Sequence, residues 1–175
     1  NMDVNTAVHY CRHMKSVRPK LEILRDLGLG YLTLGEETPS LSGGEAQRLK
    51  LASEMGRKQA DSVFVFDEPT ACQDRHGIRL LSGIINALSS EGKLVITITH
   101  DMEFVAENFD RTVCMADKHI LMDDKTNRIL TDDSLMEKAA LKKPNVSYLA
   151  SEMGFEGVIT SEDFLAALTE NSKRL

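Results

Sequence analysis

The sequence predicts an α/β fold in which a mostly parallel sheet is flanked by helices. Two short runs, Val63–Phe66 and Leu94–Thr99, are almost wholly apolar or β-branched, which is typical of strands buried on both faces of a parallel sheet. Between them lies a helical stripe of apolar residues: Ile78, Leu81, Ile84, Ile85 and Leu88. A strand, a helix and a second strand in this order indicate a layered fold with a right-handed crossover.

The chain before the first strand is expected to be helical. Residues 1–30 predict two helices: Asp3 or Asn5 can cap the first, Pro19 suits the first turn of the second, and Gly28 can end it in the left-handed conformation. A longer helix is expected to follow the Gly43-Gly44 turn and to end near Gly56. We expect Leu49, Ala52 and Met55 to share one face of that helix.

The chain after the second strand predicts smaller elements. A short helix carries Met102, Val105, Ala106 and Phe109 on its inner face, and two strands over 112–115 and 119–122 are joined by a turn at Asp117-Lys118. Short helices are expected near 135–140, 146–153 and 161–168. These patterns predict three parts: a helical subdomain over 1–58, an α/β core over 59–130 and a small helical appendage over 131–175.

The composition indicates a soluble, acidic protein. The formal net charge is −6 and the sequence pI is about 5.4, which gives no support for a broadly basic nucleic-acid surface, although a local basic patch stays open. The three cysteines form no C-x-x-C pair, as expected in a reducing cytosol. No apolar run approaches the ~20 residues that span a bilayer, and no signal peptide opens the sequence. We therefore expect a cytoplasmic location.

The turn Ser42-Gly43-Gly44 is the first candidate binding element. Ser42 can cap the following helix, and Glu45 stands where a capping box places its carboxylate. Free N–H groups, a hydroxyl and the positive end of the helix dipole suit a phosphate, and two glycines permit close backbone approach. Taken alone, such a turn is more often an ordinary helix cap than a phosphate site.

The pair Asp67-Glu68 is the second candidate, because it ends a predicted buried strand. Ligands bind at strand C-termini in open α/β sheets, and two adjacent carboxylates there favour Mg²⁺. Asp67 could hold the ion and Glu68 could polarise an attacking water. His100 ends the next predicted strand and is expected at the same sheet edge, within reach of a terminal phosphate or the water. The alternatives are a solvated turn before Pro69 and a structural histidine.

At this point the chain resembles the nucleotide-binding domain of ABC-type ATPases, which have a P-loop NTPase fold. L-S-G-G-E at 41–45 resembles their signature motif, V-F-V-F-D-E-P-T at 63–70 resembles their Walker B strand, Gln73-Asp74 stands at the D-loop and His100 at the H-loop. The resemblance implies ATP and Mg²⁺ as cofactors and a second ATPase domain as partner. Nucleotide contacts from the signature and D-loop would involve Ser42, Gly43, Gly44, Glu45, Gln47 and Asp74. In the same chain, Asp67 would hold Mg²⁺, with Glu68 and His100 catalytic.

One motif of that family is missing. The sequence contains no G-x-x-x-x-G-K-[ST], so the main phosphate cradle and its lysine are absent, and no Q-loop can be placed. We therefore expect the chain to be a C-terminal fragment of a longer ATPase and to be inactive in ATP hydrolysis by itself.

Two branches of the family compete. Residues 3–70, especially G-L-G-Y-L-T-L-G and the G-G-E-A-Q-R form of the signature, resemble the UvrA subunits of bacterial excinuclease ABC, which implies ATP-dependent DNA-damage recognition in nucleotide excision repair, with DNA and other repair subunits as partners. Beyond Thr70 this likeness fades, because UvrA-like proteins tend to carry T-G-L-H after D-E-P-T, where this chain has Ala71-Cys72-Gln73-Asp74.

Residues 94–150 instead resemble transporter ATPases of the cobalt and energy-coupling-factor type, which would imply a membrane subunit as partner. We favour the UvrA-like hypothesis because its stretch is longer and more specific. An upstream C-x-x-C zinc module would support it and would add zinc as a cofactor outside this sequence. A third alternative is an isolated dimerisation or interaction module.

Overall fold

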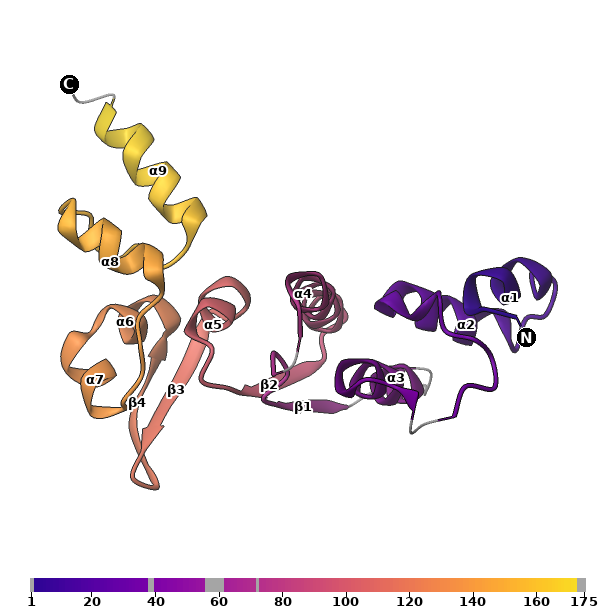
Figure 1. The fold of residues 1–175 in the computed structure, drawn as a ribbon. Coiled ribbons are helices and arrows are strands. Elements are labelled where there is room, and N and C mark those ends of the chain that lie inside the picture. The colour runs from indigo at the N-terminus through magenta and orange to yellow at the C-terminus, as the bar shows by residue number, and fades with distance from the viewer. Residues whose placement is uncertain (1, 38–39, 56–61, 72, 173–175) are drawn as a thin grey trace. The chain divides into compact units, whose positions relative to one another are not determined.

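The computed structural model describes residues 2–37, 40–55, 62–71 and 73–172, which belong to two compact units (Figure 1). The first unit is Asn1–Ile98 and the second is Thr99–Leu175. The boundary between them lies inside the expected core over 59–130, and the three-part division stays a prediction. Within the described ranges, no helix is both long and apolar enough to cross a bilayer.

Three short helical segments open the first unit: α1 (Val4–Tyr10), α2 (Arg18–Leu24) and the π-helical turn η1 (Arg25–Leu29). Asp3 caps α1, as predicted, because its carboxylate accepts the N–H of Thr6 at 2.7 Å. Pro19 lies in the first turn of α2, and Gly28 has the left-handed φ of 72°. The chain does not end its helix there but continues as a wide turn through Leu29, with Leu27 and Leu29 buried.

The remaining elements of the first unit are α3 (Gly43–Met55), β1 (Val63–Asp67), α4 (Arg75–Ser90) and β2 (Leu94–Ile98). The predicted helix after the glycine turn is therefore confirmed up to Met55, and Gly56 lies outside the described residues. β1 and β2 pair in parallel, with Val65 opposite Ile96 and Asp67 opposite Ile98. Parallel pairing places the C-terminal ends of both strands at one edge of the sheet.

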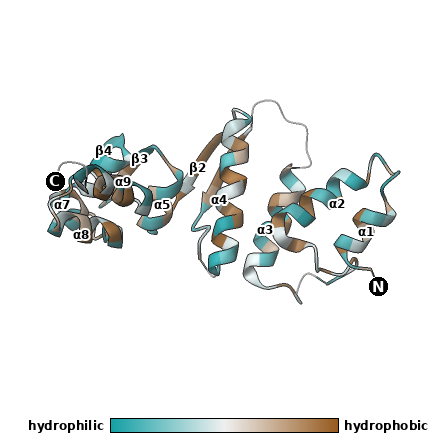
Figure 2. Cartoon of the chain, turned by 90° about the horizontal axis from the view of Figure 1, so that it is seen from above, coloured by the Kyte–Doolittle hydropathy of each residue, from teal (hydrophilic) through white to brown (hydrophobic). Residues whose placement is uncertain are grey.

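Helix α4 covers one face of this sheet. Its predicted stripe is confirmed at Leu81, Ile84, Ile85 and Leu88, which are all buried, whereas Ile78 is half-buried. Helix α4 also contacts β2. Apolar and polar positions alternate around this helix (Figure 2). The residue before it, Asp74, accepts the N–H of Gly77 and caps it. The helix therefore begins at the end of the loop that follows Asp67-Glu68.

The other face of the sheet is exposed, which corrects the prediction of strands buried on both faces. The side chains that point to this face are largely apolar and between 44% and 61% exposed: Val63, Val65, Leu94, Ile96 and Ile98. The continuous apolar runs correctly predicted parallel strands. They wrongly predicted full burial, because the described part of the chain supplies a covering helix for one face only.

This exposed sheet face leads to a prediction about self-association. Replacing the facing pair Val65 and Ile96 by threonine is expected to lower concentration-dependent association, because threonine keeps the β-branch but reduces exposed apolar surface. Sedimentation velocity at rising concentration measures the effect. The control is Val113→Thr, which changes an exposed valine in the second unit. An unchanged oligomer distribution in the double variant would contradict the prediction.

The second unit surrounds an antiparallel hairpin with helices. Its elements are α5 (Met102–Asn108), β3 (Arg111–Ala116), β4 (His119–Lys125), α6 (Thr126–Thr131), α7 (Asp133–Lys138), α8 (Asn145–Glu152) and α9 (Ser161–Ser172). The predicted turn is confirmed: Asp117 and Lys118 have φ of 49° and 65°, as a type I′ turn requires. The described strands thus form one parallel and one antiparallel pair, so the expected parallel arrangement holds for β1 and β2 only.

The core of the second unit lies between the hairpin and the helices. Its buried residues are Met102, Val105, Cys114, Ile129, Leu130, Leu135, Met136 and Ile159. Met102 and Val105 were predicted to point inward, whereas Phe104, which is 1% exposed, was not. Helix α6 was also not predicted, although it supplies the most deeply buried residue of this core, Leu130.

Candidate functional site

The glycine turn at the start of α3 forms the predicted capping box. The N–H of Ser42 donates to Oε2 of Glu45 at 2.6 Å, and the N–H of Glu45 donates to Oγ of Ser42 at 3.3 Å. Two backbone donors at the helix start are thereby satisfied reciprocally. The Ser42 and Glu45 side chains are therefore fixed against the turn.

Tyr31 adds a third contact to this cap, because its hydroxyl donates to Oε1 of Glu45. The Tyr31 hydroxyl, and after it the Ser42 N–H, lower the pKa of the Glu45 carboxyl below its usual value. The same bond to Glu45 raises the pKa of the Tyr31 hydroxyl. Tyr31 follows η1, so the cap ties α3 to the preceding helical segments.

The lowered pKa of Glu45 predicts a pH-dependent cap. A carboxyl whose pKa is lower in the folded state stabilises the fold above its unfolded pKa, about 4.3 for glutamate, and loses this contribution as the pH falls through the folded value. Amide hydrogen exchange at Ser42 is therefore expected to accelerate as the pH falls through the folded-state pKa of Glu45. Glu45→Gln keeps an acceptor oxygen for the Ser42 N–H but cannot titrate. The exchange rate of the Ser42 amide, divided by its intrinsic rate, is compared in the wild type and in Glu45→Gln. If it rises equally in acid in both proteins, the prediction is contradicted.

The two glycines of the turn have different surroundings. A Cβ added at Gly43 would meet no atom within 4 Å, so the turn is open on that side. Gly44 is buried, and a Cβ there would come within 2.7 Å of the Gln73 amide. Gly43 therefore offers open backbone to a ligand, whereas Gly44 permits close packing inside the unit.

Asp67 and Glu68 lie at the C-terminal end of β1, as predicted. Asp67 is exposed at the strand end, and the N–H of Glu68 donates to the carbonyl oxygen of Ile98 at 2.8 Å. Glu68 has φ of 45°, a left-handed conformation that is uncommon for a residue with a side chain and is often found at functional sites. The next residue, Pro69, is fully buried. The bent backbone therefore turns the chain out of the sheet at the two carboxylates.

A two-carboxylate site is chemically suited to Mg²⁺, which takes oxygen ligands and commonly uses one or two protein carboxylates together with water and phosphate. Among the described residues, no group of three or more histidine, cysteine, aspartate or glutamate side chains is placed to hold a metal ion. Asp67 and Glu68 are oxygen donors of the kind that such an ion takes.

The loop after Asp67-Glu68 is connected to helix α3 by side chains. Nη1 of Arg48 donates to Oε1 of Gln73 at 2.8 Å, and Nε2 of Gln73 donates to Oε1 of Gln47 at 3.3 Å. Gln47 and Asp74 were predicted to be nucleotide contacts. In the structure, Gln47 binds Gln73, and Asp74 caps α4 through the N–H of Gly77, which lowers the pKa of the Asp74 carboxyl.

Arg48 was absent from the predicted site, and Gln73 was placed at the D-loop without a predicted contact. The sequence does carry a signal for Gln73. This loop departs from the T-G-L-H pattern, because Gln73 places an amide where that pattern has an apolar side chain. A cavity of about 430 Å³ lies beside these contacts, lined by α3, β1 and α4.

The second unit contains His100, two residues after β2 ends. β2 ends beside Asp67, so the chain leaves the sheet at the predicted edge. The structure brings Ser42, Gly44, Gln47 and Asp74 together in the first unit. The position of His100 relative to Glu68 stays a prediction.

Comparisons with known proteins show which proteins the chain is similar to. No family model matches the chain. UvrABC system protein A of Thermus thermophilus is 32% identical over 151 residues, which are 86% of this chain and 15% of that protein. The crystal structure of UvrA2 from Deinococcus radiodurans matches with a TM-score of 0.66 and 30% identity, over 75% of this chain and 17% of that one. Over most of its length, the chain is therefore similar to a segment of UvrA proteins.

Other relatives carry the same name. UvrABC system protein A of Lactiplantibacillus plantarum is 41% identical over 105 residues, 59% of this chain and 11% of that protein. The UvrA-like chain therefore spans 11–15% of the length of these curated relatives. The match to the UvrA2 structure confirms the coarse fold class, which is an α/β ATPase-like fold.

The UvrA likeness continues beyond Thr70, where the motifs alone indicated that it fades. An alignment over 86% of the chain leaves few residues out and necessarily includes residues 94–150. The transporter resemblance of that stretch gains no support from these relatives.

Proposed function

We propose that this UvrA-like segment supplies the signature turn and the hydrolytic carboxylates of an ATPase that recognises DNA damage in nucleotide excision repair. The observation that carries the proposal is the alignment with UvrABC system protein A, which extends over most of the chain. Its support in the structure is that α3 and the loop after β1 belong to one unit and contact each other through Gln73.

Two sets of residues take different roles in this proposal. Ser42, Gly43 and Gly44 close on a nucleotide held by another ATPase domain, which supplies the phosphate cradle that this sequence lacks. Glu45 and Gln47 hold the shape of the turn, and Asp74 fixes the loop beside it. The open surroundings of Gly43 fit a backbone that meets phosphate.

The second set acts on a nucleotide bound on the side of this chain. Asp67 binds Mg²⁺ directly or through water, and Glu68 orients and polarises the attacking water. His100 hydrogen-bonds the terminal phosphate or the water. Bound Mg²⁺ would neutralise charge that develops on the phosphate oxygens. The left-handed backbone at Glu68 supports this role, because such strain persists where the surrounding structure holds a side chain in a required position.

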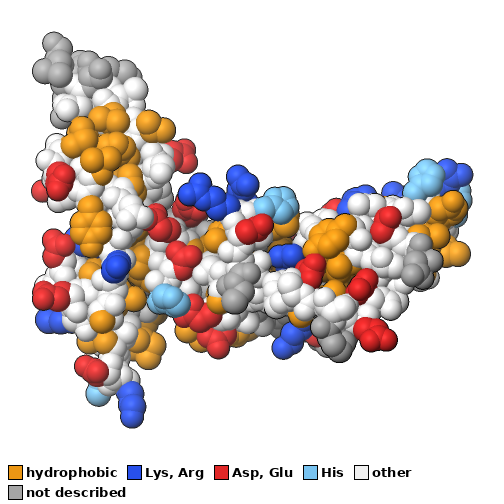
Figure 3. All heavy atoms as spheres, viewed as in Figure 1, with side chains coloured by type: hydrophobic (Ala, Val, Ile, Leu, Met, Phe, Trp, Pro, Cys, Tyr) orange, Lys and Arg blue, Asp and Glu red, His pale blue; other side chains and the backbone are white. Residues whose placement is uncertain are grey.

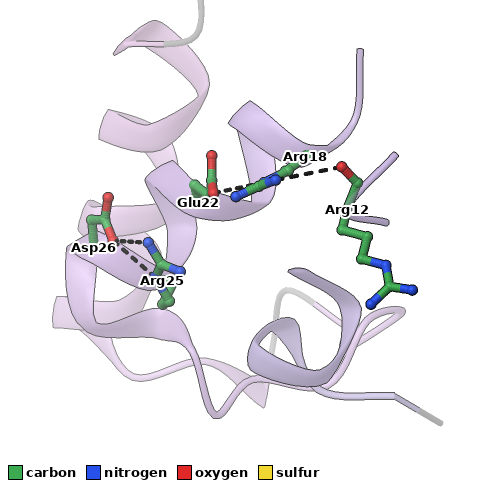
Figure 4. A network of polar contacts seen from close by, with 5 residues as sticks. All are labelled: Arg12, Arg18, Glu22, Arg25 and Asp26. Carbon is green, nitrogen blue, oxygen red and sulfur yellow. Dashed lines mark hydrogen bonds and ion pairs between the residues drawn. The ribbon is translucent and has the colours of Figure 1, made fainter. Parts of the chain in front are cut away.

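A local basic segment supports DNA as the partner. Residues 9–25 carry five Lys and Arg but one acidic residue, in a chain with a net charge of −6. Arg18 is paired with Glu22 at 2.9 Å and Arg25 with Asp26 at 2.9 Å, whereas the Arg12 side chain points away from both pairs (Figure 4). Over the face seen in Figure 3, acidic and basic side chains are otherwise interspersed.

Salt-dependent binding of damaged DNA tests the proposal in the longest natural protein that contains this chain. Lys15 and Lys20 are exposed and form no ion pair with any described carboxylate. The logarithm of the DNA-binding constant falls linearly with the logarithm of the salt concentration. Replacing both lysines by glutamine is expected to make this slope shallower by up to about 2, since each lost phosphate contact contributes about 0.9. The matched control replaces Lys138 and Lys142, which are exposed in the second unit. Absence of any salt-sensitive DNA binding would overturn the repair proposal.

A second candidate function is a dimerisation or interaction module. The observation that favours it is the apolar face of β1 and β2, which is exposed in the described chain. The threonine variants at Val65 and Ile96 test it. Loss of self-association without change in DNA binding would assign that face to assembly.

A further inference from the structure

The side chain of Gln73 is held between two helix starts of the first unit. Its amide oxygen accepts from Arg48 and its amide nitrogen donates to Gln47, both on α3, across more than twenty positions of the sequence. These contacts are partly buried. Gln73 itself belongs to the loop that leaves β1 and enters α4.

Two buried glycines make room for this amide. A Cβ at Gly44, in the first turn of α3, would come within 2.7 Å of Nε2 of Gln73. A Cβ at Gly77, in the first turn of α4, would come within 2.5 Å of Oε1 of the same side chain. The amide therefore fills a slot that is bounded by one glycine from each helix and by polar partners on α3.

We infer that Gln73 is a positioning residue that fixes the signature turn to the loop following Asp67-Glu68, so that the two parts move as one body. The inference rests on the proposed function, because only that function makes the turn and the loop parts of a nucleotide-binding site. Gln73 acts through its hydrogen bonds with Arg48 and Gln47.

The side-chain chemistry explains why an amide suits this position. An amide offers one acceptor and one donor group, which match the guanidinium of Arg48 and the carbonyl of Gln47. A leucine, which the T-G-L-H pattern places here, would fill the slot but leave the buried part of Arg48 without this partner. Nε of Arg48 is buried and has no hydrogen-bond partner among the described atoms. The bond from Nη1 to Gln73 therefore helps to fix the position of the guanidinium, and its loss would leave a second donor, which is partly buried, without this partner.

Amide hydrogen exchange on the full 175-residue chain, without nucleotide or DNA, tests the inference. The reporters are the N–H of Ala46, bonded to the Ser42 carbonyl at 2.9 Å, and the N–H of Ile78, bonded to the Asp74 carbonyl at 3.0 Å. Q73L is expected to accelerate exchange about tenfold at both reporters, as the loss of one to two net hydrogen bonds implies. Q73E keeps the acceptor for Arg48, and the Gln47 amide can turn to donate, so exchange is expected to stay within about threefold of wild type.

The exchange pattern decides between coupling and a local effect. Acceleration at Ile78 alone, with Ala46 as in wild type, would overturn the inference, and so would Q73E behaving like Q73L. The control is Arg79→Ala on the exposed side of α4, which is expected to change neither reporter.

A second variant keeps the inference falsifiable if Q73L does not fold. Gly44→Ala adds one carbon to the slot and displaces the Gln73 amide without removing it. Exchange is then expected to rise at Ile78, which follows Gly77 in α4, and unchanged exchange there would overturn the inference. These outcomes involve no ligand, so a failure of the repair proposal in the DNA-binding test would be seen separately.

Discussion

Replacing Glu68 by glutamine is expected to lower kcat for ATP hydrolysis by about 10²–10⁴-fold, the usual contribution of a general acid–base residue. Glutamine keeps the shape of the side chain but cannot accept a proton from the attacking water. Because Asp67 and the signature turn are unchanged, KM for MgATP is expected to stay near the wild-type value. Steady-state kinetics of the longest natural protein that contains this chain provide the measurement.

The matched control for this variant is Glu91→Gln. Glu91 is an exposed glutamate at the C-terminal end of α4, so its replacement removes the same charge from the first unit, far from the carboxylate pair in the sequence. Its kcat is expected to stay within about twofold of wild type. If Glu68→Gln also retained kcat within about threefold, Glu68 would be excluded as the residue that activates water.

Replacing Ile85 by alanine is expected to destabilise the first unit by about 2–5 kcal/mol, the usual cost of deleting a buried isoleucine side chain to alanine. Ile85 is 2% exposed and lies on the face of α4 that contributes the core of this unit. Urea denaturation followed by circular dichroism measures the loss in the free energy of unfolding.

Arg79→Ala is the control for the core substitution, because Arg79 is exposed on the same helix. Its effect is expected to stay within about 0.5 kcal/mol, as is usual for surface positions. A cost below about 1 kcal/mol for Ile85→Ala would show that α4 is not packed as the structure has it. The position of the loop that follows Asp67-Glu68 depends on this packing, since α4 begins where that loop ends.

Local features of the fold were predictable from the sequence. The capping box needed only Ser42 and Glu45 at the correct spacing, and the hairpin turn needed only Asp117-Lys118 between two short apolar runs. The parallel pairing of β1 and β2 followed from their apolar character and the helix between them. In each case the residues that determine the structure are close together in the sequence.

Features that depend on distant residues were not predictable. Burial of both sheet faces failed because it depends on what covers the sheet, and the described chain covers one face. The Gln73 bridge was missed because its partners lie more than twenty positions away on α3. The wide turn at η1 was missed because Gly28 is compatible both with ending a helix and with continuing it; the structure places Gly28 directly against Leu80, where a Cβ would come within 2.5 Å of Cδ1.

We propose that this chain supplies residues to an ATP site whose phosphate cradle it lacks. The test is ATP hydrolysis measured with Mg²⁺ on the purified 175-residue chain, beside the longest natural protein that contains it. We expect no turnover above the buffer blank for the chain alone and Mg²⁺-dependent turnover for the longer protein. Robust Mg²⁺-dependent hydrolysis by the chain alone, abolished by Glu68→Gln, would contradict the claim, because the site would then be complete within these residues.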